Sequence, residues 1–128
     1  MDRSPRGVIL RSIPAVLWAA AIYLSSEIPG SSLPSSGGLA PVAHFVEYAI
    51  LAGLIVFALP VKRPPAARIA IAVTLATAFG VLDELHQSFT PGRTPDVWDV
   101  AVDLAGALLG ATVVGRLIER LRARNLSR

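Results

Sequence analysis

Three groups of polar side chains are spaced so that the members of each would lie on one face of a helix. The groups are His44, Glu47 and Tyr48; Asp83, His86 and Gln87, with Glu84 beside Asp83; and Asp96, Asp99 and Asp103. Side chains three, four or seven residues apart share a helical face, so carboxylates and imidazoles would converge if these helices pack together. Such a set could hold a hard divalent cation or act as acid and base in a reaction.

Glu47 and Asp103 are the two carboxylates that a surface role explains least well, because each lies a turn or more inside apolar sequence. If these apolar segments cross a membrane, an ionised carboxylate a turn or more inside them is costly unless it has a partner. We expect His44 and Glu47 to face Asp103 across the bundle, together with Asp99. Arg93 would lie above them, either as a counterion or as a group that binds a phosphate or carboxylate of a ligand.

The candidate residues fall into two roles. The catalytic candidates are His44, Glu47, Asp83, Glu84, Asp99 and Asp103, and the ligand-binding candidates are Tyr48, Gln87 and Arg93. Structural roles stay open beside these, since a carboxylate such as Asp96 is typical of a helix N-terminus. A divalent cation is a candidate cofactor, although the sequence has neither an H-E-x-x-H zinc motif nor a phosphate-binding glycine loop.

The elements that must position these groups are four strongly apolar stretches. Hydrophobic residues make up 53% of the 128 residues and charged residues 16%, whereas a soluble domain is about one quarter charged. The segments 69–82 and 104–115 lack the polar stripe that a helix at a soluble surface would show. We therefore expect an all-α, integral membrane four-helix bundle that forms a single domain over residues 1–128. The predicted helices are at about 7–24, 41–59, 66–85 and 95–118.

The connections between these stretches also carry signals. The loop 25–40 is rich in Ser, Gly and Pro and should be irregular. Pro91 and Gly92 predict a turn, and the segment 94–96 (TPD) is typical of a helix start. Gly106 and Gly110 are four residues apart, a spacing that lets another helix approach closely.

The distribution of charge predicts the orientation in the membrane. Of the twelve Lys and Arg residues, only Arg93 lies among the carboxylates of the two outer connections. Loops rich in Lys and Arg stay in the cytoplasm, so both termini should be cytoplasmic and the acidic groups should lie at the outer face. Because the bases flank apolar segments, they indicate topology and contact with anionic lipid, not nucleic-acid binding. The absence of cysteine excludes disulfides and thiolate metal ligands.

Three segments resemble the VanZ-like family of bacterial membrane proteins: LSSEIPG (24–30), HFVEYAILAGL (44–54) and DELHQSFTPGRTPDVWDVAVDLAGALLG (83–110). They occur in the family's order and together extend over nearly the whole chain. The resemblance implies that the characteristic polar positions are His44, Tyr48, Asp83, Glu84, Gln87, Arg93 and Asp99. Glu27 stands where the family often has Gln, and Asp103 stands where Asn is usual.

The resemblance also implies a role in the bacterial cell envelope, because the family takes its name from an accessory protein in resistance to the glycopeptide teicoplanin. We weigh two interpretations equally: an enzyme acting on a lipid-linked or cell-wall precursor, and a module that binds such a precursor or a glycopeptide. An ion-coupled transport subunit and a purely structural cluster are the alternatives. Membrane lipids are expected partners in the bacterial cytoplasmic membrane, and a homo-oligomer is a candidate assembly.

Overall fold

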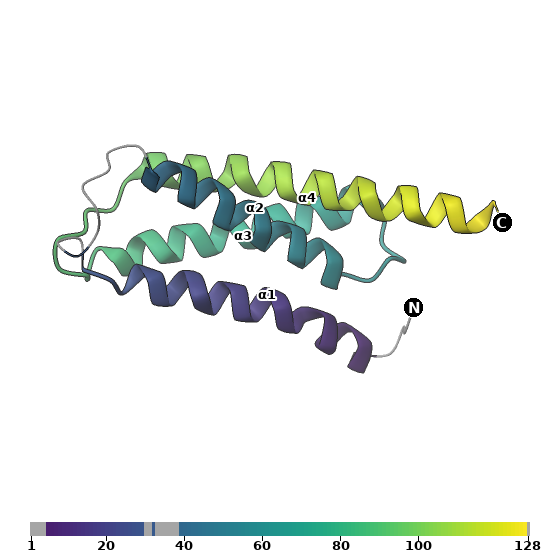
Figure 1. Cartoon of the computed structure of the whole chain (residues 1–128), viewed down its shortest axis with the longest axis horizontal. Coiled ribbons are helices and arrows are strands. Elements are labelled where there is room, and N and C mark those ends of the chain that lie inside the picture. The colour runs from purple at the N-terminus through teal and green to yellow at the C-terminus, as the bar shows by residue number, and fades with distance from the viewer. Residues whose placement is uncertain (1–4, 30–31, 33–38, 128) are drawn as a thin grey trace.

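Four helices account for most of the chain (Figure 1). The computed structural model describes residues 5–29, 32 and 39–127. Its helices are α1 (Pro5–Ser26), α2 (Leu39–Ala58), α3 (Pro65–Gln87) and α4 (Val97–Leu126). Each is long and apolar enough to cross a membrane, and the described residues form no strand. The all-α four-helix prediction is confirmed, and half of the loop expected at 25–40 lies outside the described residues.

Both ends of helix α4 differ from the predicted ends at residues 95 and 118. Helix α4 begins at Val97 because Asp96 is its N-cap, with the carboxylate accepting a hydrogen bond of 2.8 Å from the Trp98 backbone N–H. It ends at Leu126, well beyond the predicted residue 118. The apolar run stops near 118, but the Arg, Leu, Glu and Ala residues that follow are strong helix formers. Hydropathy marks the part of α4 suited to the bilayer, not the end of the helix.

Helices α2 and α4 form the closest pair in the bundle, and α1 is the most loosely packed helix. A Cβ atom on Gly106 would overlap the backbone of Phe45, and one on Gly110 would overlap the backbone of Ala49. The close approach predicted for these two glycines is therefore made within the chain, by α2. The buried core around this contact contains many small side chains, including those of Ala52, Ala72, Ala76, Ala107 and Ala111.

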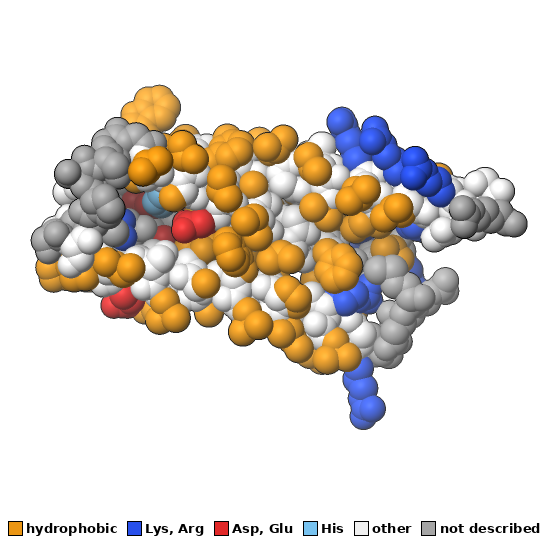
Figure 2. All heavy atoms as spheres, in the orientation of Figure 1, with side chains coloured by type: hydrophobic (Ala, Val, Ile, Leu, Met, Phe, Trp, Pro, Cys, Tyr) orange, Lys and Arg blue, Asp and Glu red, His pale blue; other side chains and the backbone are white. Residues whose placement is uncertain are grey.

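The two ends of the bundle differ in charge (Figure 2). Most Lys and Arg side chains gather at the end where α1 begins and α4 ends, while the His side chains and most Asp and Glu side chains lie toward the opposite end. At the basic end, Arg68 is completely buried. Its guanidinium lies 3.2 Å from the Glu119 carboxylate and donates a 3.1 Å hydrogen bond to the backbone carbonyl of Val56. This contact joins α2, α3 and α4.

Candidate functional site

At the acidic end, three helices bring an imidazole and three carboxylates together. Nδ1 of His44 on α2 lies 3.0 Å from a carboxylate oxygen of Asp103 on α4. One nitrogen of His44 and one carboxylate oxygen each from Glu84 and Asp99 lie within 4.8 Å of one another. We call these four residues the His44 cluster. His44, Glu84 and Asp103 are buried, and Asp99 is half-buried.

Local structure holds the cluster in place. The backbone N–H of Asp96 donates a 2.9 Å hydrogen bond to the Glu84 carboxylate, which ties the start of α4 to α3. Asp99 follows in the first turn of α4 and so has a fixed position beside Glu84. On the other side, Gly80 leaves room for the Asp103 carboxylate, because a Cβ atom there would lie 2.6 Å from Asp103 Oδ2. The capping role of Asp96 agrees with its interpretation as a structural charge at a helix N-terminus.

Several buried polar atoms in this region have no hydrogen-bond partner in the part of the chain that the structure describes. They are Oε1 of Glu84, Oδ2 of Asp103 and the hydroxyl of Tyr48. A buried acceptor or donor without a partner is unfavourable and is rare in folded proteins. The cluster therefore has unused binding capacity.

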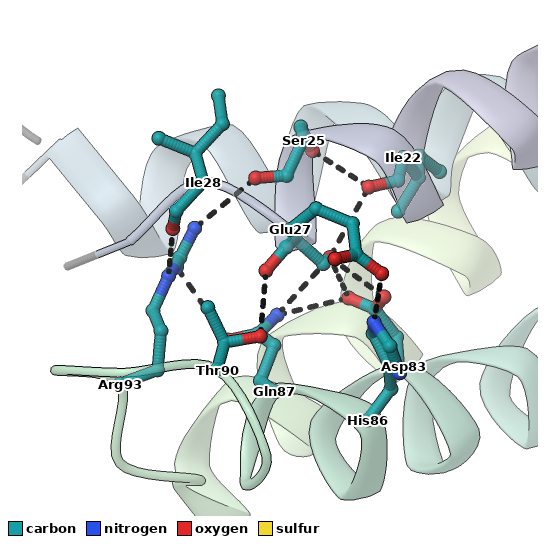
Figure 3. Close-up of polar contacts among 10 residues, drawn as sticks. Ile22, Ser25, Glu27, Ile28, Asp83, His86, Gln87, Thr90 and Arg93 are labelled. Atoms are coloured by element: carbon teal, nitrogen blue, oxygen red, sulfur yellow. Dashed lines mark hydrogen bonds and ion pairs between the residues drawn. The ribbon is translucent and has the colours of Figure 1, made fainter. Parts of the chain in front are cut away.

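The second group of predicted site residues does something different: it holds the end of α1 (Figure 3). The hydroxyl of Ser26 lies 2.6 and 2.8 Å from the two carboxylate oxygens of Asp83. Gln87 donates a 2.9 Å hydrogen bond to Asp83, and Thr90 donates a 3.3 Å bond to the Ser26 carbonyl. We call these four residues together with Arg93 the α1 clasp.

Arg93 completes the clasp from the turn between α3 and α4. Its Nε and one terminal nitrogen donate to the backbone carbonyls of Ile28 and Ser25, at 3.2 and 3.3 Å. Its other terminal nitrogen lies 3.5 Å from the side-chain oxygen of Gln87. A guanidinium carries five N–H donors, so these three contacts leave capacity for a further acceptor. Arg93 reaches over the end of the bundle toward α1, and it forms no ion pair with the His44 cluster.

A cavity of about 310 Å³ lies between the clasp and the His44 cluster. Its polar wall is formed by His44, Glu47, Asp83, Gln87 and Arg93, and its apolar wall includes Ile28 and residues at the start of α2. The cavity therefore borders both groups.

Glu47 is the predicted residue whose position differs most from expectation. Its side chain is half-buried and lines the cavity, and it forms no hydrogen bond or ion pair to Asp99, Asp103 or any other described residue. Its backbone carbonyl accepts a 2.9 Å hydrogen bond from the Trp18 indole, which anchors α1 against α2 at this level. The carboxylate thus faces the cavity and has no hydrogen-bond or ion-pair partner among the described residues.

Sequence reasoning missed the residues that α1 contributes. Ser26 is only 2% exposed, yet a serine near a helix end gives no signal of its partner when the tertiary arrangement is unknown. His86 is also paired, since its Nε2 lies 2.7 Å from the Glu27 carboxylate at a more exposed position. The only sequence signal for Ser26 and Glu27 was that both lie in the segment 24–30, which resembles the VanZ-like family.

The arrangement offers two kinds of chemistry. The His44 cluster provides nitrogen and oxygen donors of the type that bind divalent cations. The cavity provides carboxylate acceptors, one amide and one guanidinium beside an apolar wall, which suits an amphiphilic molecule.

No curated protein and no solved structure gives a significant match to this sequence. The model of the VanZ/LLP1 family matches residues 6–118, which include all four helices up to the basic end of α4. The His44 cluster, the α1 clasp and the cavity all lie inside the matched region. On this match, the chain is a multi-pass membrane protein that belongs to the VanZ/LLP1 family.

Proposed function

We propose that this protein binds the polar headgroup of a lipid-linked cell-envelope component in the cavity at the acidic end of the bundle. In this proposal the protein lies in the bacterial cytoplasmic membrane with both termini in the cytoplasm, and the cavity opens at the extracytoplasmic face. The excess of Lys and Arg at the opposite end supports that orientation.

The observation that carries the proposal is the Glu47 carboxylate. It lies inside a predicted membrane span and lines the cavity, and no described residue bonds to it. Carboxylates at membrane depth usually face a partner or a polar cavity, and they mark functional sites. A headgroup with hydroxyl or amine donors would supply the missing partner.

The rest of the cavity fits the same kind of ligand. Asp83 and Gln87 make the wall polar, and Arg93 has N–H groups left for a phosphate or carboxylate. The apolar wall at Ile28 and the start of α2 is suited to the first methylenes of a lipid chain. Polar groups that fix orientation beside an apolar wall are typical of small-molecule sites.

Glu47→Gln tests the proposal, because it keeps the side-chain volume and removes only the charge. Native mass spectrometry of the chain purified in mild detergent should show a retained lipid-linked species in the wild type and its loss in Glu47→Gln. Glu27→Gln is the matched control: it removes a carboxylate at the same end, but Glu27 bonds to His86 and does not line the cavity. Equal lipid retention in Glu47→Gln and Glu27→Gln would contradict the proposal.

The wild type and the same two variants also test whether ligand binding has an effect on the cell envelope. Expression of the wild type in a teicoplanin-susceptible bacterium should lower susceptibility to this glycopeptide. Glu47→Gln should return susceptibility to the level of cells without the protein, at equal abundance in the membrane, while Glu27→Gln should behave as the wild type.

A further inference from the structure

We propose that the His44 cluster binds one divalent metal ion, with His44, Glu84 and Asp99 as its ligands and Asp103 as the residue that orients His44. The ligand atoms come from α2, α3 and α4 and lie within 4.8 Å of one another. Ligand atoms bound to one ion at about 2.0–2.2 Å lie no more than about 4.4 Å apart. Small side-chain movements would therefore close the site around an ion.

An unsatisfied atom provides independent support. Glu84 is only 5% exposed, and its Oε1 has no hydrogen-bond partner among the described residues. Its other oxygen accepts the backbone N–H of Asp96, so the carboxylate cannot rotate freely to find another donor. A metal ion at the cluster would satisfy Oε1 without moving the backbone.

The contact between Asp103 and His44 prepares the imidazole for this role. Asp103 is fully buried and lies 3.0 Å from Nδ1, so Nδ1–H can donate to the carboxylate. The proton is then on Nδ1, and the lone pair of Nε2 is free to bind the ion. Metal-binding histidines commonly donate their second nitrogen to a carboxylate in this manner, which fixes both tautomer and ring orientation.

The negative charge of the His44 cluster is a third reason to propose a metal ion there. The cluster gathers the carboxylates of Glu84, Asp99 and Asp103, and it has no Lys or Arg among its members. Arg93 bonds instead to α1 and Gln87. A protonated His44 would offset one negative charge, whereas a divalent ion would offset two while leaving His44 neutral. One imidazole with two carboxylates suits ions of intermediate hardness, such as Mn²⁺ or Zn²⁺.

The ion would also border the proposed ligand, because His44 contributes to both the cluster and the cavity wall. A metal-bound phosphate of the headgroup is the natural use of open coordination positions. This last step rests on the proposed headgroup binding, whereas the metal site itself does not.

Metal binding is tested on the full chain in detergent, stripped with a chelator and titrated with Mn²⁺ and, separately, Zn²⁺. We expect one equivalent to remain bound after gel filtration of the wild type. Asp99→Asn and Glu84→Gln should weaken binding by more than about 100-fold, and Asp103→Asn by about 10–100-fold, the range for residues that orient a ligand. With Mn²⁺ bound, electron spin echo spectroscopy should detect a coordinated imidazole nitrogen that is lost in His44→Gln.

Asp96→Asn is the matched control, because Asn also caps helices well and Asp96 is not a member of the cluster. It should bind the ion as tightly as the wild type. Failure of the wild type to bind either ion, or equal binding by Asp99→Asn and Asp96→Asn, would overturn the metal site. Neither result would change the expected difference in lipid retention between the wild type and Glu47→Gln. The two proposals can therefore fail separately.

Discussion

A single hydroxyl group, that of Ser26, determines how the Asp83 carboxylate is used. Asp83 is buried, and both of its oxygens lie within 2.8 Å of the Ser26 hydroxyl. Gln87 supplies a further donor. The carboxylate is therefore largely satisfied inside the protein, unlike that of Glu47. Two acidic residues that look alike in the sequence thus have different roles, one holding α1 and the other facing the cavity.

Ser26→Ala should destabilise the bundle, because it removes a donor from a buried carboxylate. We expect a loss of about 1–3 kcal/mol in the free energy of unfolding, the usual cost of an unsatisfied buried group. Ser25→Ala is the control, since among the described residues the Ser25 hydroxyl bonds only to the Ile22 carbonyl in its own helix. Thermal unfolding in detergent would compare the two variants, and equal melting temperatures would show that the clasp adds nothing to stability.

The contact between His44 and Asp103 could be predicted from the sequence, because both residues lie on polar helical faces at similar depth. The clasp could not. Its acceptors include the backbone carbonyls of Ser25 and Ile28, and no side-chain pattern identifies a carbonyl that a distant arginine will reach. Arg93 was expected to lie above the carboxylates, and only its contact with α1 explains where its guanidinium points.

At the level of the helices, the pairing of α2 with α4 depends on two positions without side chains. The backbone of α2 lies against Gly106 and Gly110, where a Cβ atom would overlap the carbonyls of Phe45 and Ala49. Because Phe45 follows directly after His44, this contact also sets the distance from His44 to Asp103. The metal-binding geometry and the helix packing therefore depend on the same interface.

Gly106→Ala and Gly110→Ala should each force α2 away from α4, with a loss of stability of about 1–3 kcal/mol or more, as for other overpacked cores. Gly53→Ala is the milder control, because its Cβ would meet a side chain, Val114 Cγ2, at 3.0 Å. Melting temperatures in detergent should fall clearly for the first two variants and less for the third. The idea fails if all three melt alike.

The predicted helices and the observed ones agree in number and order because each apolar stretch is bounded by prolines, glycines or charges. The ends agree less well. Hydropathy could not show that α4 continues to Leu126, since that part of the helix is stabilised by its own propensity and not by an apolar face.

At the level of the whole molecule, the separation of charge predicts a single orientation. We expect reporters fused after Lys62 and after Leu126 to be cytoplasmic, and a reporter inserted at Gly92 to be extracytoplasmic. The basic residues flanking the helices at one end supply the physical reason. A cytoplasmic reporter at Gly92 would reverse the orientation and remove the cavity from the outer face.

The buried Arg68 has a consequence for biogenesis. Its partner Glu119 lies 51 residues later in the chain, so α3 emerges from the ribosome before the carboxylate on α4 can dock beside it. Until then the guanidinium has only the Val56 carbonyl as a described partner from earlier in the chain, and it should stay near the aqueous surface. Docking of α4 would then enclose Arg68 and draw the three helices together. On this view α4 closes the bundle last, and the carboxylates of α4 reach His44 only after α4 has docked.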